Sequence, residues 1–466
     1  MENPNRFTLY GWTACIWILV VSFQYGYHIS ALNQIQAVLT CRVPADDAEK
    51  VNPRFGLPTC IPMTDATFSV VTSVYTIGGL LGSMVANVII DRWGRHAAVR
   101  SSAASYLAGS AIMGFSASLA PLIIGRVLVG LGAGFGLCVG PIFVSEIAPS
   151  KIKGAVGVLT QFAIVIGIMT TQAIGLRWST PHDWRLVLLT SAALSFVQLI
   201  LGPFIVESPT WLSRHKHLDK KKVAARKLWG NTSATAERND VESSDPLLGD
   251  EESDSESEQG KESHEAISVP QSFTKPELRR PLTIVCFSML CQQLSGVNAV
   301  LYYSNDILSK ALPDLGPYVS LGITVINVIM TFPPIFLIER VGRKQLLSLS
   351  ATGALISLLA VGYGLDSGLV TLASVTIITF IASFATGIGP VPFVMIPEVS
   401  PPYAVSALSS VGLSLNWIAN FLVGLVFLPL RNLLAHGDPS KEGRVFYVFA
   451  ALLAFCSFVL LRVYRG

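Results

Sequence analysis

Long apolar runs recur along the whole chain, and polar residues gather in the short stretches between them. Each run reaches the roughly 20 residues that an α-helix needs to cross about 30 Å of hydrocarbon. The pattern predicts an all-α membrane protein with both termini on the same side of the bilayer. Its twelve predicted spans lie near residues 9–33, 66–90, 97–118, 121–144, 154–177, 185–206, 281–304, 317–338, 346–365, 370–395, 404–428 and 444–463.

A long polar segment separates the sixth span from the seventh. We predict two six-helix bundles over residues 1–206 and 281–466, joined by a linker over 207–280. The linker begins with a lysine-rich stretch of short helices and continues into an acidic, serine-rich run from Glu237 to Glu265. That run has no apolar period and a high charge density, so we predict that it is disordered.

Composition and charge fit a membrane environment. Of the 466 residues, 51% are hydrophobic and 14% are charged, against about 25% charged in soluble domains. Lys and Arg are more frequent on the side that holds both termini and the linker, and such an excess marks the cytosolic side. We therefore expect the termini and the linker in the cytosol, and the loop after the first span outside the cell or in a lumen.

The seven cysteines fall into two groups. Cys41 and Cys60 lie in the polar loop after the first span, where an oxidising compartment would let them pair. The alternative is two unpaired thiols in that loop. The other five lie within apolar runs, where a free thiol packs as a small hydrophobic group: Cys15, Cys138, Cys286, Cys291 and Cys456.

Two motifs occur once in each half. The sequence DRWGRH at 91–96 recurs as ERVGRK at 339–344, and SEIAP at 145–149 recurs as PEVSP at 397–401. Such a duplication is typical of secondary transporters built from parallel repeats, with the substrate site between the repeats near the midplane. We expect ion pairs here that close the cytosolic side; the alternative is that the cations only anchor the helices. The corner residues are Arg92, Arg95, Glu146 and Lys153, and Glu339, Arg340, Arg343 and Glu398.

Neutral polar side chains lie inside several predicted spans. Gln292, Ser295 and Asn298 are three residues apart, so we expect them to share one helical face. Amides both donate and accept hydrogen bonds, as a ring of sugar hydroxyls requires, although hydrogen bonds between helices are an alternative role. Trp417 suits the apolar face of a sugar ring. The other polar residues of this set are Gln161, Gln293, Asn327, Asn416 and Asn420.

Glycine and proline interrupt two spans. The glycines between Gly125 and Gly136 are explained by close helix packing. Pro390 and Pro392 lie in mid-span, where proline frees backbone carbonyls that line a cavity. We therefore predict a broken helix that bends during transport.

Two ionisable residues lie deep in the spans, His28 in the first and Arg126 in the fourth, at similar depth. An ionisable residue at such a depth is a functional candidate. A nearby fixed cation disfavours the charged imidazolium in low-dielectric surroundings, so we expect His28 to be neutral and to form hydrogen bonds. The alternative for this candidate coupling pair is that His28 carries a proton.

These stretches together resemble the sugar-porter family of the major facilitator superfamily, in particular the facilitative glucose transporters, over all twelve spans. The resemblance rests on QYGYHISALN (24–33), DRWGRH, GRVLVGLGAG (125–134), SEIAP, ESPTWL (207–212), QQLSGVN (292–298), GIGPVPF (387–393) and LNWIANF (415–421). It implies the major facilitator fold and an outer gate at Tyr302 and Tyr303. It places Gln161, Gln292, Gln293, Asn298, Asn327 and Asn416 at sugar-contacting positions.

The chain departs from that family at three positions. His28 stands where symporters have aspartate and facilitators asparagine, Phe393 replaces a tryptophan, and Ala385 replaces an acidic residue. The GYH sequence at 26–28 and the acidic linker resemble fungal members associated with vacuolar sorting. These departures leave the coupling to protons and the choice of sugar open.

We therefore expect transport of a monosaccharide, such as a hexose, or a similar polyol by facilitative uniport. The alternatives are a proton-coupled sugar symporter that uses His28, and a non-transporting sugar sensor or trafficking factor. We expect no enzymatic activity, cofactor, metal or nucleic-acid partner. The expected partners are a small-molecule sugar, the lipid bilayer and, in the symport alternative, protons, with the monomer as the functional unit.

A candidate sorting signal lies in the acidic linker, where Leu247 and Leu248 follow acidic residues as in a dileucine motif. If sorting adaptors bind it, the protein belongs in a vacuolar or endosomal membrane. The alternative is a solvated acidic linker and a plasma-membrane protein.

Overall fold

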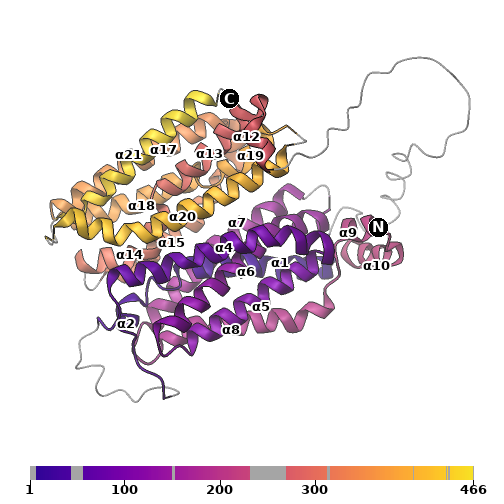
Figure 1. The fold of residues 1–466 in the computed structure, drawn as a ribbon, viewed down its shortest axis with the longest axis horizontal. Helices are drawn as coiled ribbons and strands as arrows, with labels where there is room; N and C mark the ends of the chain where they lie inside the picture. The colour runs from indigo at the N-terminus through magenta and orange to yellow at the C-terminus, as the bar shows by residue number, and fades with distance from the viewer. Residues whose placement is uncertain are drawn as a thin grey trace, which may run out of the picture.

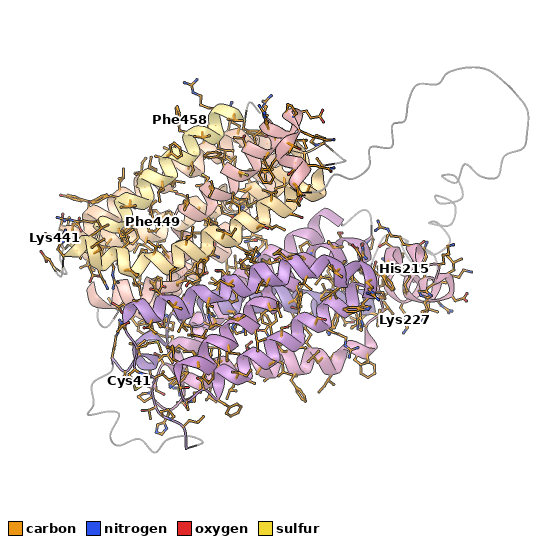
Figure 2. All side chains as sticks on the ribbon, in the orientation of Figure 1. Cys41, His215, Lys227, Lys441, Phe449 and Phe458 are labelled. Atoms are coloured by element: carbon orange, nitrogen blue, oxygen red, sulfur yellow. A yellow bond between two sulfur atoms is a disulfide. The ribbon has the colours of Figure 1, made fainter. Side chains whose placement is uncertain are left out.

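The computed structural model describes residues 7–42, 56–149, 153–230, 269–311, 315–401, 404–436, 438 and 441–464. Within these ranges every regular element is a helix. Figure 1 shows two groups of long helices side by side, the first half of the chain in violet and the second in orange to yellow. We call the end where α1 begins and α21 ends the terminal end. The opposite end, which holds α2 and Cys41, is called the disulfide end (Figures 1 and 2).

The first half contains six long helices. Glycine lets two of them, α4 and α6, approach closely, because a Cβ on Gly78 or Gly130 would collide with the backbone of the other helix. The glycine-rich run is thus explained by packing. The long helices are α1 (Leu9–Ser30), α4 (Asp65–Trp93), α5 (Arg95–Gly114), α6 (Leu119–Ile147), α7 (Lys153–Trp178) and α8 (Trp184–Leu201); α2 (Gln36–Leu39) and η3 (Gly202–Phe204) are short.

The second half also makes six crossings, but three of them are broken. The first crossing is α13 (Arg279–Leu294) with α14 (Val297–Ala311), the second α15 (Gly316–Met330) with α16 (Pro333–Arg340), and the fourth α18 (Val370–Thr386) with α19 (Val391–Val399). The unbroken crossings are α17 (Arg343–Asp366), α20 (Val405–Ala435) and α21 (Arg444–Val463).

The break before Val391 was predicted from its prolines, and the helix boundaries confirm it. Crossings also lie at the predicted spans 281–304 and 317–338, but each is interrupted, and these two breaks were not predicted. Gly296 adopts a φ of +81°, which interrupts the first of these spans. Pro333 and Pro334 lack the backbone N–H groups that would continue α15, so a new helix starts there.

Hydropathy agrees with a membrane location. Among the described residues, ten helical segments are long and apolar enough to cross a bilayer, and Gly316–Met330 is a shorter apolar helix. The remaining crossing is α5, whose 20 residues rise about 30 Å although many are Ala or Ser. The chain is therefore an all-α membrane protein with twelve crossings in two six-helix bundles.

The segment that joins the two bundles along the chain has short helices at the terminal end, namely α9 (Pro209–Arg214), α10 (Leu218–Trp229), α12 (Val269–Thr274) and η4 (Pro276–Leu278). The end of α10 packs on the first bundle, since Thr8 donates its backbone N–H to the Leu228 carbonyl at 3.0 Å. Trp229 likewise donates to the carbonyl of Ile147 at 2.8 Å. Leu247, Leu248 and the acidic run lie outside the described residues.

The two halves meet along α4 and α20, which run antiparallel (Figure 1). Near the disulfide end Asp65 accepts a hydrogen bond from Asn432, and farther along Ser83 accepts one from Trp417. From Asp65 to Ser83 along α4, the partners on α20 therefore run backwards from Asn432 to Trp417. The contact between α4 and α20 therefore brings residues of both halves together along the interface between the two bundles.

Candidate substrate site and the two ends of the bundle

Four amide side chains of the second half form a hydrogen-bonded chain, which we call the amide ladder: Gln292, Gln293, Asn298 and Asn416. The Gln292 oxygen accepts from Asn416 Nδ2 at 2.7 Å and from Gln293 Nε2 at 3.2 Å. Asn298 donates to the Gln293 oxygen, and Gln292 Nε2 donates to the carbonyl of Gly389 at 2.6 Å. All four side chains are buried. The ladder thus ties three crossings, two of them broken, to one another.

The break between α13 and α14 shapes this ladder. Ser295 donates its hydroxyl to the Gln292 carbonyl at 2.6 Å, which ends α13, and Gly296 turns the chain into α14. A Cβ on Gly296 would also lie 3.0 Å from the Phe449 ring. The expected single helical face over 292–298 is therefore wrong. Instead, the turn brings Asn298 back onto Gln293.

Two further amides, Gln161 on α7 and Asn327 on α15, lie apart from the ladder. Gln161 is exposed and Asn327 is half-buried. Neither side chain makes a hydrogen bond within the part of the chain that the structure describes. Phe162 and Phe332, with ring centroids 5.0 Å apart, connect the two halves nearby. These two amides are therefore free to bind a polar molecule in this conformation.

Trp417 is enclosed by the first half. Its Nε1 donates to Ser83 Oγ at 2.9 Å, and its ring makes edge contacts with Tyr25 and Tyr75. Gly79 leaves room for the ring, because a Cβ there would collide with it. In this conformation Trp417 joins the two halves, and its role at a sugar ring stays a prediction.

The tyrosines predicted as an outer gate, Tyr302 and Tyr303, are buried near the disulfide end. Tyr302 donates to Asn420 Oδ1 and Tyr303 to the Gly424 carbonyl, each at 2.9 Å. Tyr303 also meets Phe68 of the first half, with ring centroids 6.2 Å apart. The contact between Tyr303 and Phe68 joins the two halves at this depth, and the role of the tyrosines as a gate stays a prediction.

Asn33, which the sequence did not single out as a contact residue, holds the halves together at the same level. Its Nδ2 donates to the Leu301 carbonyl at 3.0 Å and to Ser304 Oγ at 2.8 Å. Its oxygen accepts the backbone N–H of Asn305 at 3.0 Å. Because the three partners all lie on α14, one side chain of the first half binds a full turn of the second.

His28 and Arg126 lie at the same depth, as predicted, but their side chains do not pair. Arg126 Nη1 donates to the His28 backbone carbonyl at 3.0 Å, and its other nitrogens donate to the carbonyls of Val71 and Thr72. The guanidinium also lies over the Tyr75 ring at 4.7 Å. Backbone carbonyls and an aromatic face therefore stabilise this cation.

The His28 ring belongs to a separate network of neutral groups. Its Nε2 is 2.7 Å from Ser191 Oγ and 3.1 Å from Ser110 Oγ. Ser191 in turn donates to Gln24 Oε1 at 2.7 Å, and the imidazole stacks on Tyr106. Hydroxyl and amide partners fit the neutral imidazole expected from the sequence.

The repeated motifs form ion pairs at the terminal end. Arg95 binds Glu146 through two hydrogen bonds of 2.8 Å, and Arg343 Nη2 lies 2.8 Å from Glu398 Oε1. Each pair joins two helices of the same half. In this conformation the pairs therefore brace each bundle and do not connect the bundles.

Two other predicted corner residues, Arg92 and Arg340, form no ion pair with a described side chain. Arg92 is exposed and lies over the Trp93 ring at 5.9 Å, and Arg340 is exposed. The side chains of Lys153 and Glu339 lie outside the described part of the structure. The prediction that these four residues belong to a cytosolic lock stays a prediction.

Glu207 is a corner residue that sequence reasoning missed. Its carboxylate accepts the backbone N–H groups of Arg95 and His96 at 3.1 Å, and thereby caps the start of α5. Gly94 adopts a φ of +93°, and a Cβ there would collide with this carboxylate. Burial raises the pKa of Glu207, and the backbone donors counteract part of that effect. The signal in the sequence was the ESPTWL stretch, whose first residue is this carboxylate.

At the disulfide end the structure pairs Cys41 with Cys60, whose Cα atoms are 5.2 Å apart. Arg42, the next residue, forms an ion pair with Asp65 at the start of α4. Figure 2 places Cys41 and Lys441 of the second half at this same end. Among the described residues, no cluster of three or more His, Cys, Asp or Glu side chains could hold a metal ion.

Comparison with known proteins places this geometry in a family. A sequence model described as "Sugar (and other) transporter" matches residues 14–465. A probable metabolite transport protein of Saccharomyces cerevisiae is 33% identical, with 95% of this chain and 90% of that protein covered. Vacuolar protein sorting-associated protein 73 of the same yeast is 30% identical, with 97% and 92% covered. The facilitated glucose transporter member 3 of Bos taurus is 30% identical, with 87% and 81% covered.

Solved structures show the same fold. The xylose transporter XylE from E. coli, in an inward open conformation, matches with a TM-score of 0.71 at 18% identity. That match covers 98% of this chain and 97% of the bacterial one. At this identity the likeness concerns the fold, and the sequence matches establish the relationship. The chain belongs to the sugar (and other) transporter family.

Proposed function

We propose that this protein carries a monosaccharide, such as a hexose, or a similar small polyol across a membrane by alternating access. The amide ladder is the observation that carries the proposal. Four neutral amides buried in an apolar bundle match hydroxyl groups, which need donors and acceptors together. Gln161 and Asn327 would complete the site from α7 and α15, and Trp417 would contact the sugar once it leaves Ser83.

Two relatives support this substrate class by their names, one as a facilitated glucose transporter and one as a xylose transporter. In the proposed cycle the halves 1–206 and 281–466 move as two bodies around the central amides. In the conformation described here, Asn33 and Tyr303 join the two halves at the disulfide end. With the terminal end in the cytosol, as the basic residues indicate, this is the state that receives or releases sugar on the cytosolic side.

Uptake into proteoliposomes tests the transport proposal. The purified protein should equilibrate one or more sugars from a panel of labelled hexoses, pentoses and inositol. Gln292→Ala should slow uptake more than tenfold, because it removes the centre of the ladder, whereas Gln345→Ala on an exposed position should not. Absence of uptake for the whole panel would contradict the proposal and favour a sensor or trafficking role.

We further propose that transport is facilitative uniport. The support is that His28 contacts neutral hydroxyls and that Arg126 is satisfied by carbonyls. Equilibration should then proceed without a pH gradient and should be insensitive to a protonophore. Accumulation against a sugar gradient that collapses with a protonophore would contradict uniport.

Proton-coupled symport is a second candidate, favoured by one observation. His28 Nδ1 is buried and has no hydrogen-bond partner among the described residues, so it offers a site for a proton. A related fold is known from a D-xylose-proton symporter. Symport predicts that His28→Ala abolishes uphill uptake but leaves exchange of labelled sugar intact.

We propose a vacuolar or endosomal membrane as the location, with both termini in the cytosol. The support is the relative named for vacuolar protein sorting and the acidic dileucine at Leu247 and Leu248. Replacement of both leucines by alanine should move a tagged protein to the cell surface. An unchanged distribution would remove the sorting-adaptor proposal.

A further inference from the structure

Contacts from both halves converge on one carboxylate at the disulfide end. Asp65 is the first residue of α4, and Arg42 of the same half forms an ion pair with it. Asn432 Nδ2 of α20 donates to Asp65 Oδ2 at 3.1 Å, and Arg431 Nη2 lies 3.9 Å from the same oxygen. The carboxylate is thus shared between a cation of its own half and two donors of the other.

Arg431 on α20 is a buried cation that lies near two carboxylates, one of which is Asp65. The Arg431 side chain is 2% exposed, and its other nitrogen lies 3.8 Å from Glu442. Removal of Asp65 takes one of these two carboxylates away from a buried cation, which costs free energy. The start of α4 adds to the effect, because the N-terminus of a helix favours an anion such as Asp65.

Opening the disulfide end must separate these groups. The same end is closed by Tyr303 against Phe68 and by Asn33 against α14, and both contacts cross between the halves. Any motion that frees them also moves the start of α4 away from the end of α20. The energy of the contacts between Asp65 and α20 is therefore lost on opening and regained on closing.

We propose that Asp65 is a positioning residue for transport, whose carboxylate holds the disulfide end closed and so sets the ratio of closed to open carrier. The role rests on the proposed alternating access. Asp65 touches no residue of the amide ladder in this structure. Its replacement should therefore lower the KM for sugar offered from the disulfide side more than it changes kcat.

Cysteine labelling measures this opening directly. Ser73 on α4 is fully buried against Gly424 of α20, so a cysteine there is shielded while the end is closed. The reporter Ser73→Cys is placed in the full chain with the five free cysteines replaced by serine and the disulfide kept. A membrane-impermeant maleimide is then added from the disulfide side, without sugar.

Asp65→Asn should speed labelling of the reporter about tenfold, within the 5- to 150-fold range of typical coupling energies. Asp65→Glu keeps the charge and should restore slow labelling. Asp438→Asn is the matched control: it removes a carboxylate at the same end whose partner, Lys441, lies 3.0 Å away in the same half. That control should label at the parent rate.

Asn432→Ala removes one donor and keeps both charges, and should speed labelling by a smaller factor, about threefold. This variant carries the test if Asp65→Asn does not fold. Parent-like labelling of Asp65→Asn and Asn432→Ala, or equal acceleration in Asp438→Asn, would overturn the proposal. Because labelling needs no sugar, a failed transport assay would contradict the proposed function and leave this result interpretable.

Discussion

The two ends of the bundle use charge differently. At the terminal end Arg95–Glu146 and Arg343–Glu398 each join helices of one half. At the disulfide end the carboxylate of Asp65 joins one half to the other. Pairs of the first kind keep a bundle rigid while it moves, whereas contacts of the second kind must break in every cycle.

The terminal pairs also differ from each other although their motifs are repeats. Arg95 and Glu146 are 5% and 14% exposed, whereas Arg343 and Glu398 are 33% and 36% exposed. In the first half Glu207 adds a cap on the same corner. The same motif therefore makes a buried brace in one half and a partly solvated one in the other.

The largest effect should come from the buried brace. Glu146→Ala leaves the guanidinium of Arg95 buried without its partner, and we expect a loss of about 3 kcal/mol of stability. Glu398→Ala, at the solvated repeat, should cost less than about 1 kcal/mol. Thermal unfolding of the two purified variants, monitored by fluorescence, measures the difference. Equal losses would show that burial does not distinguish the repeats.

Removing the disulfide should have the next largest effect. Cys41→Ser with Cys60→Ser frees the loop that carries Arg42, and we expect a loss of about 2 kcal/mol of stability. The same variant should also speed labelling of the Ser73→Cys reporter, because Arg42 no longer holds Asp65 in place. Faster unfolding without faster labelling would separate loop stability from closure of the disulfide end.

Loss of the hydrogen bond between Trp417 and Ser83 should cost less. Trp417→Phe keeps an aromatic ring among Tyr25 and Tyr75 but removes the donor, so we expect about 1 kcal/mol less stabilisation of the closed contact. Ser83→Ala removes the acceptor, and a double-mutant cycle on reporter labelling gives the coupling. Additive effects of the two substitutions would show that the bond does not join the halves.

The smallest effect should be the pH dependence due to Glu207. Burial raises its pKa above the ordinary 4.5 in the folded protein, so the folded state binds more protons than the unfolded state between the two values. Stability from this group therefore falls as the pH rises through that interval. As the pH rises above 4.5, the melting temperature of the wild-type protein should decrease slightly relative to that of Glu207→Gln. A rise would mean that the backbone donors outweigh burial.

Most of the fold could be predicted from the sequence, because the length and hydropathy of a span depend on local composition. The twelve crossings and the break at Pro390 follow from the local sequence, because each depends on residues within the span itself. The break at Gly296 was missed because a single glycine is also tolerated within a helix. Its role shows only where Ser295 ends α13 and the Phe449 ring leaves no room for a Cβ.

For the candidate site, the sequence predicts which residues take part, but it does not predict which of them form hydrogen bonds with one another. The amides of the ladder stood out as polar groups in apolar spans. Their bonds to one another depend on how α13, α14 and α20 meet. Glu207 and Asp65 were missed because a carboxylate at a helix end looks like a solvated residue until its distant partner is known.

Distances across both ends, measured by spin labels, test the central claim most directly. One pair joins Ala117 and Leu369 at the disulfide end, and the other joins Lys222 and Gln345 at the terminal end; all four positions are exposed. Alternating access predicts that a transported sugar lengthens the first distance in a fraction of molecules and shortens the second in the same fraction. Distances that stay fixed, or that change in the same direction at both ends, would contradict the account.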